Sequence, residues 1–239
     1  MTPSPIALSP IGTVHSCFTD KFGVPRQPGI IAEARGHIEL IPPYNLREAV
    51  NELESFSHLW VIFHFNRSDR DEWKPTVRPP RLGGNKRVGV FASRSNFRPN
   101  PMGLSVVRLE EVEEKEGRIL IHISGLDLLD RTPVLDIKPY IPYVDAIPGA
   151  TGGFAPESPA PRLCVTFSSQ SEETLAKLCP KRYPNAQQLI EKVVAQDPRP
   201  AYYNQEKRDK PFGFCLWDLN IRCLVQNGIA TVVEVSHGQ

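Results

Sequence analysis

The sequence of 239 residues has only five cysteines, and no two of them form a C-x-x-C pair. An odd number of widely spaced cysteines is a poor basis for a disulfide framework or a zinc site. We therefore expect buried or incidental thiols and no bound metal. The cysteines are Cys17, Cys164, Cys179, Cys215 and Cys223.

Long apolar runs and an excess of charge are also missing. No run reaches the roughly 18 apolar residues of a transmembrane helix, and the N-terminal segment MTPSPIALSP lacks the basic start and apolar core of a secretion signal. The 28 Lys and Arg residues nearly balance the 27 Asp and Glu residues. We expect a cytoplasmic protein. Any surface that binds nucleic acid must be local, because the chain as a whole is not a general polyanion binder.

Common nucleotide-binding and catalytic motifs are missing as well. The sequence contains no G-x-x-x-x-G-K-[ST] and no G-x-G-x-x-G after a strand, which argues against P-loop and Rossmann dinucleotide sites. It contains neither H-E-x-x-H nor G-x-S-x-G, the motifs of many metalloproteases and serine hydrolases. What the sequence does contain is a set of polar clusters at the ends of predicted strands, where a small barrel can form a ligand site.

Residues 1–147 are dominated by apolar segments with the patterns of β-strands. About seven strands, interrupted by one short helix expected at residues 45–56, favour a barrel or a sandwich over a doubly wound sheet. The expected strands cover residues 11–18, 29–41, 58–66, 87–93, 104–115, 118–129 and 134–141.

Residues 148–161 are rich in Pro, Gly, Ala and Ser, and we predict that they link the first domain to a small α+β domain of residues 162–239. A helix is expected from residue 185 until Pro198 ends it. Asn227 and Gly228 then give a strong signal for a β-hairpin. The strands expected on either side of it cover residues 212–226 and 229–236.

Two polar clusters lie near the ends of early strands. In VPRQPG, prolines stiffen a loop that displays Arg26 and Gln27, which can bind a carboxylate or the edge of a heterocycle; a plain surface loop is the alternative. In FHFN, His64 and Asn66 alternate with aromatic residues. His64 is either a ligand contact or, more simply, a core histidine whose hydrogen-bonding groups are satisfied within the protein.

The segment FASRSNFRPNPMGLS has the densest set of hydrogen-bond donors in the chain. Arg94, Asn96, Arg98 and Asn100 supply donors, two prolines restrict the backbone, and Gly103 allows a ligand to approach the main chain. This composition favours a site for a small ligand with anionic groups. The alternative is an arginine-rich turn that pins the two strands it joins.

Three further features carry charge or aromatic rings. In LLDRTPVLDIKPY, carboxylates next to a fixed turn can bind ribose hydroxyls or an amino group. From Arg67 to Arg98 the sequence contains nine Lys or Arg residues and three acids. This excess of positive charge suits either phosphate contacts or a solvated basic loop. In QDPRPAYY, Asp197, Arg199 and two tyrosines suit base stacking and phosphate contact.

Taken together, SRSNFRPNPMGLS, PRQ, FHFN, LDRTPVLDIKPY and QDPRPAYY resemble the TsaA-like family, from Pro5 to about Val235. Its two-domain bacterial tRNA methyltransferase uses S-adenosylmethionine to methylate N6 of threonylcarbamoyladenosine at position 37. The resemblance implies a mainly β fold, with a small N-terminal β-barrel that binds S-adenosylmethionine outside the Rossmann class and a smaller C-terminal α+β domain. It also implies a homodimer. Met102 departs from the isoleucine that is common at that position.

The resemblance also implies site residues, carried over by matching positions. The implied cofactor contacts are Pro25, Arg26, Gln27, His64, Phe65, Asn66, Arg94, Leu104, Leu129, Asp130, Arg131, Thr132 and Pro133. The acceptor nitrogen keeps a proton that either a base or a solvent relay has to take up. The candidates for this catalytic role are Asp136, Lys138, Tyr140 and Asp197, and those for contacts with the tRNA anticodon loop are Arg98, Arg199 and Tyr202.

Two other functions stay open at this point. One is a noncatalytic barrel that binds RNA or nucleotides and grips phosphates with its arginines. The other is a methyltransferase that acts on a small metabolite or a protein. The QDPRPAYY segment favours tRNA.

Overall fold

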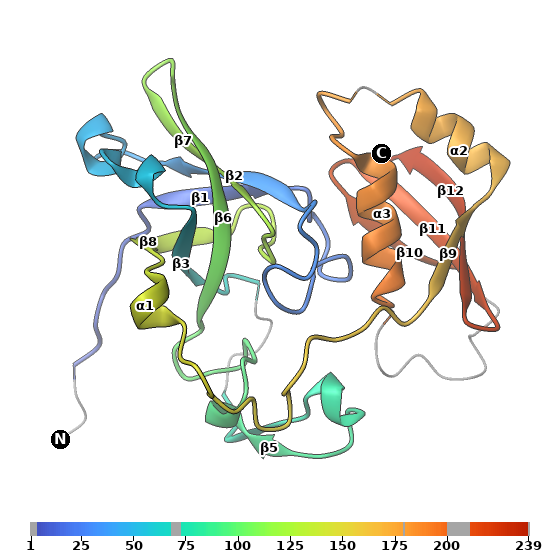
Figure 1. The fold of residues 1–239 in the computed structure, drawn as a ribbon, viewed down its shortest axis with the longest axis horizontal. Coiled ribbons are helices and arrows are strands. Elements are labelled where there is room, and N and C mark those ends of the chain that lie inside the picture. Colours follow the sequence, from blue (N-terminus) through green and yellow to red (C-terminus); the bar gives the residue numbers. More distant parts are fainter. Residues whose placement is uncertain (1–3, 68–72, 179, 200–210, 239) are drawn as a thin grey trace.

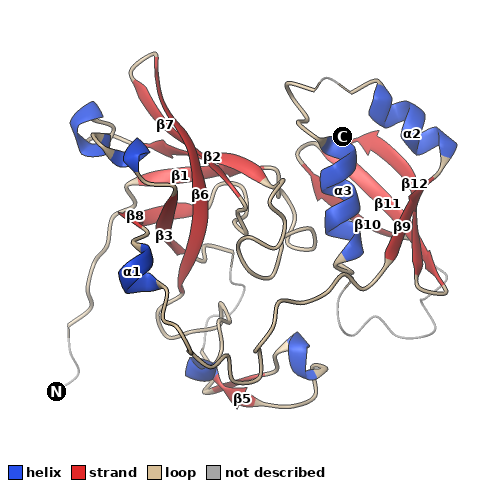
Figure 2. Ribbon diagram, viewed as in Figure 1, coloured by secondary structure: helices blue, strands red, loops and turns tan. Residues whose placement is uncertain are grey.

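The computed structural model describes residues 4–67, 73–178, 180–199 and 211–238. Figures 1 and 2 show a barrel and a separate smaller sheet flanked by two helices. No helix in the described part of the chain is long and apolar enough to cross a membrane. The predicted fold class, mainly β with a barrel followed by an α+β region, is confirmed.

Six strands close the barrel in the order β1-β2-β7-β6-β3-β8, and every neighbouring pair is antiparallel. The inward positions alternate along each strand, as in β3, where Leu59, Val61 and Phe63 are buried and their neighbours are less so. The six strands are β1 (Gly12–Ser16), β2 (Arg35–Leu40), β3 (His58–His64), β6 (Met102–Lys115), β7 (Arg118–Ser124) and β8 (Pro133–Pro139).

The C-terminal sheet has the order β10-β11-β12-β9, and β9 runs parallel to β12. Ser168 caps α2, since its side chain accepts a hydrogen bond from the Ser171 amide. The apolar side of α3 packs on the sheet and buries Leu189 and Ile190. The elements are β9 (Cys164–Phe167), α2 (Ser169–Ala176), α3 (Ala186–Ala195), β10 (Phe212–Leu216), β11 (Leu219–Gln226) and β12 (Ile229–His237).

Trp217 joins the C-terminal sheet to the barrel. Its amide donates to the Cys17 carbonyl at 2.7 Å, and its carbonyl accepts from the Thr19 hydroxyl at 2.8 Å. Gln188 on α3 donates to Glu33 at 2.9 Å. The buried residues of both parts form one continuous apolar core, so the loop after β1 is held from the C-terminal side.

The predicted hairpin at Asn227 and Gly228 is confirmed, because both residues have positive φ and connect β11 to β12. The predicted single strand at residues 212–226 is wrong, since a turn at Trp217, with φ of 53°, divides it into β10 and β11. The strand expected at residues 29–41 is shorter, and only β2 is extended.

Two other expectations are wrong. The helix predicted at residues 45–56 consists of two 3-10 turns, Arg47–Val50 and Leu53–Ser55, separated by Glu52 in the left-handed region. Only Val50 of its apolar set is fully buried, so little packing supports a longer helix.

The strand expected at residues 87–93 does not enter the barrel. It forms β5 (Val88–Gly89), which pairs only with β4 (Thr76–Val77), and then a 3-10 turn, Val90–Ala92. Another 3-10 turn, Pro80–Leu82, precedes it, and the short α1 (Pro142–Asp145) follows β8. The barrel therefore has six strands in place of about seven.

Burial raises the pKa of Cys17 and of Cys223 to about 12, so neither thiol ionises near neutral pH. Cys164 is exposed and Cys215 is half-buried. These four cysteines are free thiols, and Cys179 lies outside the described residues.

Candidate functional site

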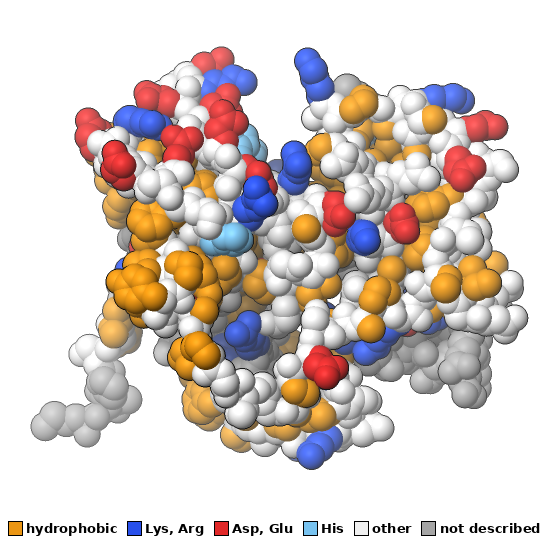
Figure 3. Space-filling view, in the orientation of Figure 1, with side chains coloured by type: hydrophobic (Ala, Val, Ile, Leu, Met, Phe, Trp, Pro, Cys, Tyr) orange, Lys and Arg blue, Asp and Glu red, His pale blue; other side chains and the backbone are white. Residues whose placement is uncertain are grey.

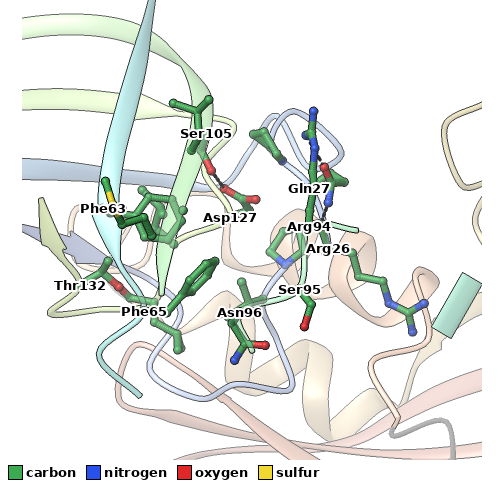
Figure 4. A pocket seen from close by; sticks show the side chains of 18 of the residues that line it. Arg26, Gln27, Phe63, Phe65, Arg94, Ser95, Asn96, Ser105, Asp127 and Thr132 are labelled. Atoms are coloured by element: carbon green, nitrogen blue, oxygen red, sulfur yellow. Dashed lines mark hydrogen bonds between the residues drawn. The ribbon is translucent and has the colours of Figure 1, made fainter. Parts of the chain in front are cut away.

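A pocket of about 560 Å³ opens at the end of the barrel where β3 ends and β6 begins. Segments far apart in the sequence line it: the loop at residues 24–28, the segment at residues 93–98 and the turn at residues 127–132 (Figure 4). Its volume falls within the range of small-molecule sites. The loops that the sequence singled out therefore meet at one place.

Ten of the predicted site residues line this pocket. They are Pro25, Arg26, Gln27, Phe65, Asn66, Arg94, Arg98, Leu104, Leu129 and Thr132. Their roles as ligand contacts stay predictions, since their common position in the pocket does not identify what they bind.

Arg94 connects two of the converging loops. Its Nη1 donates to Gln27 Oε1 at 2.6 Å, and the Gln27 amide donates in turn to the Arg26 carbonyl (Figure 4). The two loops are 67 positions apart in sequence. Arg94 is also one of the residues that line the pocket, to which it brings positive charge.

Arg98 holds its own loop together. Its Nη1 donates to the Ser93 carbonyl at 2.8 Å, with the Val90 and Ser95 carbonyls at 3.5 Å, and its guanidinium lies 5.9 Å from the Phe91 ring centroid. An arginine with these partners fixes a turn. The interpretation of this segment as a pinned turn and its interpretation as a ligand loop are therefore compatible.

The turn at residues 129–132 is fixed by hydrogen bonds between side chains and backbone groups. Arg131 has φ of 63°, and its carbonyl accepts from the Asn66 side chain at 3.1 Å. Asp130 does not line the pocket; its carboxylate accepts from the Ser16 amide at 3.1 Å. Thr132 donates to the Leu129 carbonyl at 2.8 Å. The turn thus presents Leu129 and Thr132 to the pocket, while Asp130 anchors it to β1.

Apolar side chains form one wall of the pocket. Phe63 and Phe65 meet edge to face with centroids 5.0 Å apart. Met102 and Leu104 are 39% and 52% exposed, which is high for apolar residues beside a pocket. An aromatic or apolar part of a ligand would cover them.

Asp127 and Ser105 line the pocket as well, although neither was among the residues predicted from the sequence. Ser105 Oγ donates to Asp127 Oδ1 at 2.6 Å. Burial raises the pKa of Asp127 to about 6, against the lowering effects of the Ser105 hydrogen bond, its own backbone amide and the Arg94 charge. An acid enclosed by apolar residues, as in GLDLL, was the available signal.

The candidates for the proton acceptor lie outside this pocket lining. Asp136 and Lys138 form an ion pair at 3.0 Å, with side chains 47% and 63% exposed. Tyr140 lies against the Trp60 ring at 5.9 Å between centroids. Trp60 lines the pocket, whereas Asp136, Lys138 and Tyr140 do not. Tyr140 therefore adjoins the pocket lining through its contact with the Trp60 ring.

Asp197 and Arg199 pair with each other. Arg199 donates to both carboxylate oxygens of Asp197 at 2.7 and 2.9 Å, and both side chains are largely buried. Burial and the charge of Arg162 lower the pKa of Arg26, and Asp197 opposes this effect. Asp197 therefore acts electrostatically on a pocket residue without lining the pocket. Tyr202 lies outside the described residues.

His64, Arg131 and Pro133 also lie beside the pocket lining without belonging to it. His64 is the last residue of β3, between two lining phenylalanines, and Pro133 begins β8. On β1 and β2, His15, His37 and Glu39 have potential metal-ligand atoms within 4.8 Å of one another. The predicted absence of a metal stays a prediction.

The fold and the pocket define a β-barrel protein with a pocket of small-molecule size at one end of the barrel and a C-terminal α+β sheet, outside the Rossmann class. Residues 13–146 match the tRNA-methyltransferase O N-terminal domain, and residues 160–238 match the TrmO C-terminal domain. The chain belongs to the TrmO family of tRNA methyltransferases, and the predicted family relationship is confirmed.

Several relatives share most of their length with the chain. The tRNA (adenine(37)-N6)-methyltransferase of Escherichia coli K12 is 48% identical over 89% of this chain and 90% of its own. A Pseudomonas aeruginosa protein, RcsF, described as a candidate S-adenosylmethionine-dependent methyltransferase, is 47% identical over 90% of each chain. The crystal structure of TrmO from Pseudomonas aeruginosa superposes with a TM-score of 0.80, at 37% identity over 98% of this chain and 99% of that one.

Proposed function

We propose that this protein transfers the methyl group of S-adenosylmethionine to N6 of adenosine 37 in tRNA, where the adenosine carries a threonylcarbamoyl group. One observation carries the proposal: the loops implied as cofactor contacts, although distant in sequence, converge on one pocket. The chain also belongs to a tRNA-methyltransferase family, and full-length relatives are named for adenine-37 N6 methylation.

The residues of the pocket suit S-adenosylmethionine. Arg26 and Arg94 offer donors for its carboxylate, and the apolar side chains of Phe65 and Leu104 can cover adenine. When bound, the cofactor supplies an electrophilic methyl group. The protein has to align the acceptor nitrogen, exclude water and receive the N6 proton.

Nucleoside mass spectrometry tests the proposed reaction. Incubation of the protein and S-adenosylmethionine with tRNA that contains threonylcarbamoyladenosine is expected to add one methyl group to that nucleoside. Matched tRNA with unmodified adenosine 37 tests whether the threonylcarbamoyl group is required. Binding of cofactor and tRNA without any methyl gain would contradict the enzymatic proposal and favour a noncatalytic RNA-binding barrel.

Replacing Arg94 with alanine is expected to raise the Kd for S-adenosylmethionine about tenfold, because a charge-assisted hydrogen bond is lost. Isothermal titration calorimetry measures this Kd, and the melting temperature should change little. Arg108→Ala is the matched control, since Arg108 is on β6 with a side chain 66% exposed and does not line the pocket. An unchanged Kd in Arg94→Ala would remove Arg94 from the cofactor site.

We further propose that residues 162–239, linked to residues 1–147 by residues 148–161, contact the anticodon loop. The basic pocket rim supports this, as does the position of Asp197 near Arg26. Acidic side chains gather at the far end of the barrel, around the β6–β7 hairpin (Figure 3), where RNA phosphates would be repelled.

Replacing Tyr202 with alanine is expected to raise KM for tRNA at least fivefold, because stacking of one base contributes about 1–3 kcal/mol. The Kd for S-adenosylmethionine should not change. Steady-state kinetics with tRNA varied, together with calorimetry, measure both quantities. If KM for tRNA equals that of the unaltered protein, Tyr202 does not bind the anticodon loop.

A cytoplasmic homodimer completes the proposal. Large apolar side chains are exposed around α1, with Tyr143 at 88%, Val144 at 57% and Ile147 at 71%, and Figure 3 shows apolar side chains gathered on that side of the barrel. Burial of such a patch favours association. Light scattering during size-exclusion chromatography measures the mass, and a monomer at micromolar concentration would exclude the dimer.

A further inference from the structure

Asp127 occupies a distinctive place in the pocket. Among the described residues that line the pocket it is the sole carboxylate, and it shares the lining with five cationic side chains (Figure 4 labels several of these residues). It follows β7 in the segment between Gly125 and Leu128, and Ser105 on β6 hydrogen-bonds it at 2.6 Å. The cationic residues of the lining are Lys21, Arg26, Arg67, Arg94 and Arg98.

Its protonation behaviour suits a proton acceptor. Burial raises the pKa of Asp127 to about 6, so the carboxylate is ionised at neutral pH and is a stronger base than an ordinary aspartate. Ser105 and the Arg94 charge oppose the rise, which keeps the pKa below neutrality. The group is thus both charged and basic under working conditions.

The other acids predicted for this role, Asp136 and Asp197, are each paired with a cationic side chain. Asp136 forms an ion pair with Lys138, and Asp197 accepts hydrogen bonds from Arg199 through both carboxylate oxygens. Neither carboxylate lines the pocket. By contrast, the structure gives Asp127 Oδ1 a serine hydroxyl as its side-chain hydrogen-bond donor.

We propose that Asp127 is the general base of the methyl transfer and that Ser105 positions its carboxylate; this inference rests on the proposed function. The N6–H bond breaks and its proton moves to Asp127, while the nitrogen electron pair forms the new bond to the methyl carbon. The carbon–sulfur bond breaks with its electron pair left on sulfur, giving S-adenosylhomocysteine. The carboxylate and the sulfonium are both neutral afterwards, so charge balances.

Asp127→Asn tests the proposal, because asparagine has nearly the same shape and can still accept the Ser105 hydrogen bond. We expect kcat for tRNA to fall at least 100-fold and the Kd for S-adenosylmethionine, from calorimetry, to change less than threefold. Asp127→Glu should restore part of kcat. Glu173→Gln, an exposed change on α2, is the matched control.

The pH dependence gives a second readout. In the unaltered protein, kcat/KM for S-adenosylmethionine should fall below pH 6, where Asp127 becomes protonated. Ser105→Ala removes a contact that lowers this pKa, so the fall should move to higher pH. A ¹³C NMR titration of Asp127 in the cofactor-free protein checks the same shift without any turnover.

The outcomes distinguish failure of the proposed function from failure of Asp127 as its general base. If the unaltered protein transfers no methyl to tRNA, the proposed function fails. If it does so and Asp127→Asn keeps its kcat, Asp127 is not the base. If Asp127→Asn loses kcat and cofactor affinity in parallel, Asp127 is a cofactor contact and the inference is overturned.

Discussion

Replacing Gly103 with alanine is expected to lower the free energy of unfolding by about 3 kcal/mol, the upper range for overpacking a core. A Cβ at this position would lie 2.1, 2.4 and 2.7 Å from three atoms of the Phe63 ring. Gly103 and Phe63 are direct partners on β6 and β3, so the ring lies across the glycine. Phe63 is 5% exposed and packs against Phe65, which leaves its ring little room to move.

Urea unfolding followed by fluorescence measures this loss, and calorimetry should show weaker binding of S-adenosylmethionine, since Phe63 lines the pocket. Gly89→Ala is the matched control, because a Cβ there has no neighbour within 4 Å. An unchanged unfolding midpoint in Gly103→Ala would mean that the Phe63 ring is not confined as the structure has it.

Replacing Asp127 with asparagine is expected to stabilise the fold by about 3 kcal/mol at pH 8, although it removes activity. Burial raises the pKa of this acid from 3.8 to about 6, so the folded state holds the proton more tightly than the unfolded state. Below pH 3.8 both states are protonated and nothing is lost, and from there to above pH 6 the buried charge destabilises the fold increasingly. Asparagine cannot ionise, so its advantage exists only at the higher pH.

Unfolding free energies of Asp127→Asn and of the unaltered protein, measured at pH 3.5 and pH 8, test this directly. The difference should be near zero at the lower pH and largest at the higher one. Glu173→Gln, on the exposed side of α2, should show no such pH dependence. Equal stability of Asp127→Asn and the unaltered protein at pH 8 would mean that the Asp127 carboxylate is well solvated. A loss of folding stability caused by a buried functional group is the usual cost of a preorganised site.

Local chemistry made much of the fold predictable. Asn227 and Gly228 adopt the left-handed region at little cost, so the hairpin between β11 and β12 follows from two residues. The alternation in β3 likewise follows from strand geometry. The predicted helix at residues 45–56 was wrong because helical spacing stabilises a helix only where its apolar side is buried, and only Val50 of that set is fully buried.

The candidate site was predictable wherever a loop carried unusual composition. PRQ and the arginine- and proline-rich segment are conspicuous in the sequence, and their residues line the pocket. Asp136 and Lys138 were equally conspicuous, but the structure pairs them with each other away from the lining. Sequence composition identifies polar residues, whereas their partners depend on which strands become neighbours.

By itself, the sequence of this protein determined its strand-rich class, the stiff donor-rich loops and the family to which they belong. Only the tertiary structure decided which acid enters the pocket. Asp127 and Ser105 are 22 positions apart, and their 2.6 Å contact exists because the antiparallel pairing of β6 and β7 brings the start of one strand beside the end of the other. Burial raises the Asp127 pKa, and a run of apolar neighbours in the sequence does not by itself place a carboxylate in a pocket.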